Sequence, residues 1–199
     1  LRVRGPHVMR GYWRHETPRG SFDEEGFYCT GDAVRLLNPD NIEDGLVYDG
    51  RIAEDFKLMT GTFVNVGELR NRILIHGNEL IEDVVLVGEG KDEIGVLAFP
   101  KPTVTRRKSG LPDADWHNVL LSEPVRQWFA DFMARINQGY SASSKRIARL
   151  YVMEEAADNA VGEKTDKGNL NQRLLRNRRA QEIEALYGSA EDPFRFVAP

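Results

Sequence analysis

Two short apolar runs near the middle of the chain constrain its fold more than any other feature. Residues 83–87 read DVVLV and residues 95–99 read GVLAF. A strand with one face in water alternates apolar and polar side chains, whereas continuous apolar runs predict strands that are buried on both faces. We therefore expect these strands to belong to a sheet that is packed by helices.

Three other stretches predict those helices. Residues 66–75 (VGELRNRILI) predict a short helix, and His76-Gly77-Asn78 supplies its stop signal. A second helix is predicted from Pro124, a residue suited to a first helical turn, to about Asn137, and a third from about Asn169 to Tyr187. The second helix has one apolar face at the helical period, made of Val125, Trp128, Phe129, Phe132, Met133 and Ile136.

The remaining segments predict strands, a hairpin and loops. Residues 1–48 contain short β segments separated by Gly, Pro, Asn and Asp, too interrupted to bury a core of their own. Residues 49–64 predict a β-hairpin with Gly61-Thr62 near its turn, and a further strand is predicted at Leu150–Met153. Residues 100–115, with three prolines and a basic cluster, predict a surface loop. The fold class is therefore α+β, a small domain with a β-hairpin and a mixed sheet packed by helices, preceded by a β-rich segment.

The composition narrows the classes of function. The chain has 199 residues, 41% of them hydrophobic, which suits one domain or two small ones. Its formal net charge of -4 gives no reason to expect nucleic acid or an anionic membrane as a partner, and no apolar run approaches the length of a membrane span. The four histidines show no metal-ligand spacing, so no metal site is predicted. The single cysteine, Cys29, is compatible with a cytoplasmic location and predicts a packed side chain rather than a nucleophile.

Two residues in the first quarter of the chain have side chains that suit a nucleotide. Asp32 ends the stretch GFYCTGD, where its carboxylate can accept two hydrogen bonds from a vicinal diol such as ribose, or cap a β-turn. Arg51 follows Gly50 and offers a planar fork to phosphate or ribose oxygens, or fills a structural role. Either residue alone leaves both interpretations open.

Three lysines are likewise open to both a structural and a functional interpretation. Lys57 lies between Phe56 and Leu58 on an alternating strand, where a lysine exposed to solvent is ordinary. Lys164 and Lys167 lie in EKTDKGNLNQR, a polar stretch that is either a solvated turn or a loop whose lysine carries chemistry.

Taken together and in order, the motifs resemble a known superfamily. The stretches GPHVMRGYW, GFYCTGD, DGRIAEDFKLMTGTFVNVGELR and TDKGNLNQR are similar to the last motifs of the adenylate-forming enzymes. That superfamily comprises acyl- and aryl-CoA synthetases, firefly luciferase and the adenylation domains of peptide synthetases. Within it, FKLMTGTFVNVGELR and TDKGNLNQR most resemble feruloyl-CoA synthase-type ligases of aromatic acids.

The resemblance implies that the chain contains parts of two domains. Residues 1–51 would be the end of a large N-terminal domain and residues 52–199 a mobile C-terminal lid, with the hinge at Ala53 and Glu54. In such ligases a carboxylate attacks the α-phosphate of ATP, supplied with Mg²⁺, and the thiol of CoA then displaces AMP from the acyl-adenylate. Because the chain opens without Met in what reads as a strand, we expect it to be cut from a longer protein. The resemblance implies that the family's phosphate loop and acid pocket lie before residue 1, so we expect this chain to be inactive alone.

The resemblance also assigns roles to individual residues. Asp32 matches the residue that holds the ribose hydroxyls, and Arg51 matches an arginine that contacts ribose and phosphate. Lys57 and Gly61 match the strand and turn that face the active site during thioester formation, where the glycine leaves room for pantetheine.

The family's closing motif, T-x-x-G-K, carries a lysine that offsets the repulsion between the carboxylate and the triphosphate. Thr165 and Gly168 match this motif, but Asn169 stands where the lysine is usual. Lys167, on the other side of the glycine, is the catalytic candidate, and Lys164 is the second candidate.

Alternatives remain at two levels. The acceptor can be a carrier protein instead of CoA, or the domain can be a non-catalytic interaction module of the same ancestry. The arginines of the last predicted helix can contact CoA phosphates or form a solvated face; they are Arg173, Arg176, Arg178 and Arg179.

Overall fold

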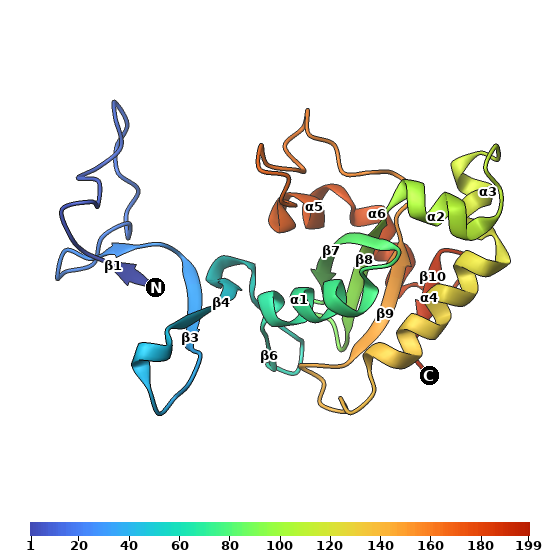
Figure 1. Cartoon of the computed structure of the whole chain (residues 1–199), viewed down its shortest axis with the longest axis horizontal. Helices are drawn as coiled ribbons and strands as arrows, with labels where there is room; N and C mark the ends of the chain where they lie inside the picture. Colours follow the sequence, from blue (N-terminus) through green and yellow to red (C-terminus); the bar gives the residue numbers. More distant parts are fainter. The chain divides into compact units, whose positions relative to one another are not determined.

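The computed structural model describes every residue from Leu1 to Pro199, and the chain divides into two compact units. The first comprises Leu1–Asp55 and the second Phe56–Pro199 (Figure 1). The predicted boundary between residues 51 and 52 lies shortly before this division.

The second unit is built on a four-stranded sheet whose strand order is β10-β9-β8-β7. Strands β7 (Ile81–Val87) and β8 (Ile94–Pro100) pair antiparallel. Strand β9 (Ile147–Val152) runs parallel to β8, and β10 (Arg195–Val197) pairs antiparallel with β9. The predicted mixed sheet is therefore confirmed, and the C-terminal tail provides its edge strand.

Two of the predicted helices form with nearly the predicted bounds. Helix α1 (Val66–Gly77) begins where the side chain of Asn65 accepts a hydrogen bond from the backbone N–H of Glu68. Helix α4 (Glu123–Ile136) carries Pro124 in its first turn, and every residue predicted for its apolar face is buried. The helical periodicity was thus sufficient to identify the buried side.

Residues 100–115 are not a loop, contrary to the sequence prediction. Helix α2 (Pro102–Ser109) begins with Pro102, whose fixed φ suits a first turn, and ends at Gly110 in the left-handed conformation (φ 70°). Helix α3 (Trp116–Leu121) follows. Proline here starts a helix instead of preventing one.

The last predicted helix is also wrong as a single element. It forms as α5 (Gln172–Arg178) and α6 (Ala180–Tyr187), separated by Arg179, whose φ of -95° and ψ of 36° leave the helical region. The Arg179 side chain is buried, so the break accompanies the burial of a charged group. Residues 169–171 precede α5 and belong to a hairpin.

The two apolar runs are buried on both faces of the sheet, as predicted. Side chains along a strand alternate between faces, and the core accordingly forms two clusters. Val84 and Leu86 belong to the cluster that includes α1 and α4, whereas Val85 and Val87 belong to the cluster that includes α5 and α6. Figure 1 shows the sheet between these two pairs of helices.

The first unit contains short strands and no buried apolar side chain. Its one buried residue is Gly50, which agrees with the expectation that this segment has no core of its own. No helix in either unit combines the length and apolar character needed to cross a membrane. The elements of the first unit are β1 (Arg2–Val3), β2 (Tyr28–Cys29), β3 (Asp32–Leu36), η1 (Ile42–Asp44), β4 (Leu46–Arg51) and η2 (Ile52–Glu54).

Candidate functional site

Asp32 and Arg51 lie side by side because β3 and β4 pair antiparallel with these two residues opposite each other. Nε of Arg51 lies 3.2 Å from Oδ1 of Asp32, and Nη1 of Arg51 donates to the carbonyl oxygen of Thr30 at 3.0 Å. The side chains remain partly exposed, 54% for Arg51 and 26% for Asp32. The pair can therefore offer an acceptor and several donors to a ligand that carries hydroxyl groups and phosphate.

A tight turn holds the Asp32 carboxylate in this position. Gly31 has a φ of 77°, which a glycine adopts without strain, and its carbonyl oxygen accepts from the N–H of Ile52 at 3.0 Å. The hydroxyl of Thr30, not the carboxylate of Asp32, accepts from the Asp32 N–H at 3.1 Å. The Asp32 carboxylate therefore does not cap its own turn, which leaves it to the ion pair with Arg51.

The predicted hinge residues lie at the end of the first unit. Ala53 is exposed and Glu54 half-buried, and both belong to the 3-10 turn η2, which starts directly after Arg51. The division between the units follows at Asp55. A short turn at such a junction is where a change in a few backbone torsions reorients whole domains.

Lys57 and Gly61 lie on one hairpin, the glycine hairpin (residues 56–64), formed by β5 (Phe56–Lys57) and β6 (Phe63–Val64). The N–H of Leu58 donates to the carbonyl of Thr62, and the N–H of Gly61 donates to the carbonyl of Leu58, both at 2.9 Å. Gly61 has a φ of 80°, and no atom lies within 4 Å of the position that a Cβ would take. The predicted turn is confirmed, and it leaves open space beside Gly61.

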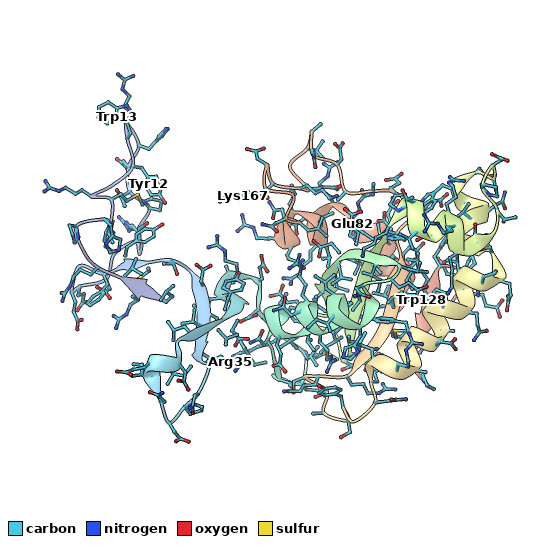
Figure 2. All side chains as sticks on the ribbon, in the orientation of Figure 1. Tyr12, Trp13, Arg35, Glu82, Trp128 and Lys167 are labelled. Atoms are coloured by element: carbon cyan, nitrogen blue, oxygen red, sulfur yellow. The ribbon has the colours of Figure 1, made fainter.

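Lys167 lies at the tip of a second hairpin, the lysine hairpin (residues 163–171). The N–H of Thr165 donates to the carbonyl of Asn169, and the N–H of Gly168 donates to the carbonyl of Thr165, both at 2.8 Å. Gly168 has a φ of 82°. Lys167 is exposed, makes no hydrogen bond or ion pair, and lies at the outer end of the loop (Figure 2).

Lys164 is held on an arm of the same hairpin. It forms an isolated β-bridge with Leu170, and its Nζ lies 2.8 Å from Oε1 of Glu82 on β7. Its side chain is 25% exposed. The structure therefore separates the two candidate lysines, because Lys164 is bound to the sheet whereas Lys167 has a free ammonium group.

Glu163, which sequence reasoning did not single out, lies buried at the foot of the lysine hairpin. Its carboxylate accepts from Arg178, from Arg179 and from the N–H of Asp158. Burial raises the pKa of Glu163, but the Asp158 N–H and the two guanidinium groups outweigh it, so the net pKa lies below the ordinary value. A glutamate in a polar stretch reads as exposed, so its local sequence contained no signal of this burial.

The arginines of the last predicted helix have different partners. Arg178 and Arg179 bind Glu163, and Nε of Arg176 donates to the carbonyl of Leu86 at 2.8 Å. Arg173 is exposed. This basic cluster is therefore largely structural and is not a uniform solvated face. In neither unit does any group of three or more His, Cys, Asp or Glu side chains converge as a metal site would require.

Comparison with known proteins gives a consistent result. A family model described as the AMP-binding enzyme C-terminal domain matches residues 55–191. A long-chain-fatty-acid–CoA ligase of Mycobacterium tuberculosis is 28% identical over 194 residues, which cover 94% of this chain and 31% of that protein. A 2,3-dihydroxybenzoate-AMP ligase of Bacillus subtilis is 42% identical over 78 residues, 38% of this chain and 13% of that protein.

A solved structure extends the comparison to three dimensions. The adenylation domain of a carboxylate reductase from Mycobacterium chelonae superimposes with a TM-score of 0.69 at 26% identity, covering 94% of this chain and 27% of that chain. The fold, a small α+β domain preceded by a β-rich segment, is therefore one that solved adenylation domains contain. The chain spans less than a third of the length of each of these relatives.

Proposed function

Because the chain belongs to the AMP-binding enzyme C-terminal domain family, we propose that residues 52–199 are the mobile lid of an AMP-forming acid–thiol ligase. Residues 1–51 are then the end of its large N-terminal domain. The observation that carries the proposal, besides the family match, is the unpaired ammonium group of Lys167 at the tip of a braced hairpin. A cation presented in this way suits a reaction between two anions.

Adenylation brings such anions together. An oxygen of the carboxylate forms a bond to the α-phosphorus of ATP, the bond from that phosphorus to the bridging oxygen breaks, and pyrophosphate leaves with the bonding electrons. Lys167 offsets the repulsion between the carboxylate and the triphosphate and orients the attacking oxygen. Asp32 accepts hydrogen bonds from the ribose hydroxyls, while Arg51 donates to ribose and phosphate oxygens.

The second step transfers the acyl group to a thiol. The thiol attacks the acyl carbon as its thiolate, having lost its proton to solvent, and the bond to the AMP oxygen breaks, so AMP leaves with the bonding electrons. Rotation of the lid about Ala53 and Glu54 replaces the lysine hairpin with the glycine hairpin at the reaction centre. The open space beside Gly61 then admits the pantetheine arm of CoA, and Lys57 lies next to that path.

We propose an aromatic, feruloyl-like acid as the substrate and the cytoplasm as the location. The acid is supported by the resemblance of FKLMTGTFVNVGELR and TDKGNLNQR to feruloyl-CoA synthase-type ligases. Two relatives are named for other acids, one for a long-chain fatty acid and one for 2,3-dihydroxybenzoate.

The central test measures the two half-reactions separately in the full-length enzyme that carries this chain. Adenylation is followed by ATP–pyrophosphate exchange, and thioester formation by release of AMP from pre-made acyl-adenylate and CoA. For Lys167→Ala we expect adenylation to fall by about 10²- to 10³-fold, as for the loss of one preorganised electrostatic contact, with thioester formation unchanged.

Lys164→Ala is the matched control, because it removes a lysine of the same hairpin that is bound to Glu82. The proposal is wrong if Lys164→Ala abolishes exchange and Lys167→Ala does not. Replacing CoA by a phosphopantetheinyl carrier protein distinguishes the two acceptors. A full-length protein without any exchange activity would identify the domain as a non-catalytic interaction module.

A further inference from the structure

The foot of the lysine hairpin contains a buried carboxylate whose two oxygens both accept hydrogen bonds. Glu163 is 1% exposed. Its Oε1 lies 3.1 Å from Nε of Arg178, and its Oε2 lies 3.0 Å from Nη2 of Arg179 and 2.9 Å from the backbone nitrogen of Asp158. Burying a carboxylate this completely requires such compensation, since an unpaired buried charge is strongly unfavourable.

Arg179 is an equally buried partner, with 8% of its surface exposed. It binds Glu163 through Nη2 and Glu155 through Nη1, the latter at 2.6 Å. It also forms the junction between α5 and α6, where its backbone leaves the helical conformation. The ion pair therefore ties the hairpin directly to the break in the last helix.

The backbone continues this attachment to the hairpin tip. The carbonyl of Glu163 accepts from the N–H of Asn171 at 2.8 Å, which pairs the two arms just outside the Lys164–Leu170 bridge. Asn171 in turn caps α5 by accepting from the N–H of Leu174 at 3.1 Å. A shift in the Glu163 side chain is thereby passed to both arms of a short, hydrogen-bonded loop that carries Lys167.

The sheet also holds the chain directly after the hairpin, where α5 begins. The side chain of Gln172, which is 2% exposed, accepts from the N–H of Leu86 at 3.2 Å and donates to the carbonyl of Val84 at 2.8 Å. Lys164 reaches Glu82 on the same strand. The hairpin is thus held at defined points on β7 and at the α5–α6 junction, and the side chain of Lys167 at its tip has no partner.

A buried ion pair is a poor means of gaining stability, because apolar residues of similar volume usually serve as well or better. What this pair supplies is direction, because three contacts fix the carboxylate in one orientation. Oε2 of Glu163 is held by Nη2 of Arg179 and the N–H of Asp158, and its Oε1 binds Nε of Arg178. We propose that Glu163 and Arg179 form a positioning pair that sets the direction in which Lys167 projects from the lid. This inference rests on the proposed function of Lys167 in adenylation.

The test compares Glu163→Gln with Lys167→Ala in the full-length enzyme. Glutamine keeps the shape of Glu163 but loses its charge. We expect Glu163→Gln to lower kcat for ATP–pyrophosphate exchange by roughly tenfold to a hundredfold, the scale of a small misplacement of a reacting group. The rate of thioester formation should stay within about twofold, because that step does not use the lysine hairpin.

Two further variants show whether the pair acts as a unit. Glu163→Gln combined with Arg179→Gln should lose no more exchange activity than the worse single variant, as expected for groups in one network. Arg179→Lys keeps the positive charge without the fork, so it should retain more exchange activity than Arg179→Gln. If Glu163→Gln fails to fold, Arg179→Lys and Arg179→Gln alone decide the question through the same kcat measurement.

Asp83→Asn is the matched control for a merely structural role. Asp83 is a buried carboxylate that binds Nε and Nη2 of Arg70 at 2.8 and 2.7 Å, and Arg70 belongs to α1 rather than to the lysine hairpin. A similar loss of exchange in Asp83→Asn and Glu163→Gln, or equal losses in both half-reactions, overturns the positioning role. Full exchange activity in Lys167→Ala instead overturns the proposed function, whatever Glu163→Gln does.

Discussion

The second unit contains two hairpins with the same backbone and different attachments. In each, a residue donates to the carbonyl four positions later, and a glycine donates back, at 2.9 Å in the glycine hairpin and 2.8 Å in the lysine hairpin. Gly61 and Gly168 have φ values of 80° and 82°. One loop tip carries the exposed apolar side chain of Met59, and the other carries the exposed charge of Lys167.

The attachments of the two hairpins differ in kind. Backbone bonds join the glycine hairpin to the turn between β7 and β8, from Met59 N–H to Lys91 carbonyl at 2.8 Å and from Gly90 N–H to Lys57 carbonyl at 3.2 Å. The lysine hairpin is joined through the ion pairs of Lys164 with Glu82 and of Glu163 with Arg179. The two hairpins thus share one backbone shape, and the contacts that anchor each hairpin determine whether its attachment depends on charge.

The largest expected effect concerns the apolar anchors. Leu58 and Leu170 are 2% and 6% exposed and belong to opposite core clusters. We expect Leu58→Ala and Leu170→Ala each to lower the free energy of unfolding by about 2–5 kcal/mol, measured by urea denaturation of the chain, with Leu170→Ala nearer the lower end because its cluster is smaller.

Met59→Ala is the control for these two variants, because Met59 lies in a hairpin but is 65% exposed. Its effect should stay within about 0.5 kcal/mol. If Leu170→Ala also falls within that range, the lysine hairpin is not anchored by apolar packing and depends on its ion pairs alone.

An intermediate effect is expected from the two glycines. A Cβ at position 61 or 168 meets no atom within 4 Å, so we expect Gly61→Val and Gly168→Val each to cost about 1–2 kcal/mol through backbone strain. The catalytic effects should diverge: Gly61→Val should slow thioester formation, and Gly168→Val adenylation, each by roughly tenfold to a hundredfold. Single-turnover assays of the two half-reactions measure this.

Gly110→Val supplies the reference for strain without function. Gly110 has a φ of 70°, also with nothing within 4 Å, and ends α2 away from both hairpins. We expect Gly110→Val to have the same small effect on the rate of adenylation and on the rate of thioester formation. The functional contrast between the hairpins collapses if Gly61→Val and Gly168→Val slow the same step.

The smallest effect is in the response to acid. The pKa of Glu163 is below its ordinary value in the folded chain, so its contribution to stability is present above about pH 4.5 and is lost as the pH falls through the lowered pKa. Unfolding by urea at pH 7 and at lower pH should therefore show a steeper loss for the unmodified chain than for Glu163→Gln. Parallel pH profiles would contradict an ionised Glu163 in the folded state.

Patterns that depend on near neighbours in sequence were predictable. The continuous apolar runs predicted strands buried on both faces, and the period of α4 predicted its buried side. The prolines of residues 100–115 led to a wrong prediction of a loop. Proline prevents a helix at interior positions but favours one at the first turn, where Pro102 lies. Distinguishing these cases requires the position of the turn, which composition does not contain.

The site was predictable only in part, for a related reason. Asp32 and Arg51 were identified separately, and the pairing of β3 with β4 brings them together. The break at Arg179 has no glycine or proline to announce it, and Arg179 binds Glu163, which lies sixteen residues earlier. Contacts between side chains that meet only in the folded chain leave no local trace.

The attachment of Gln172 to β7 has a consequence for the order in which the lid folds. The glycine hairpin closes within a few residues, and β7 and β8 meet across a short turn. Gln172 must close a loop of 86 residues to reach Leu86 on β7. Loop closure over such distances is entropically costly and slow. As the chain leaves the ribosome, the glycine hairpin should therefore form first, while the contacts that hold the lysine hairpin against β7 should form among the last.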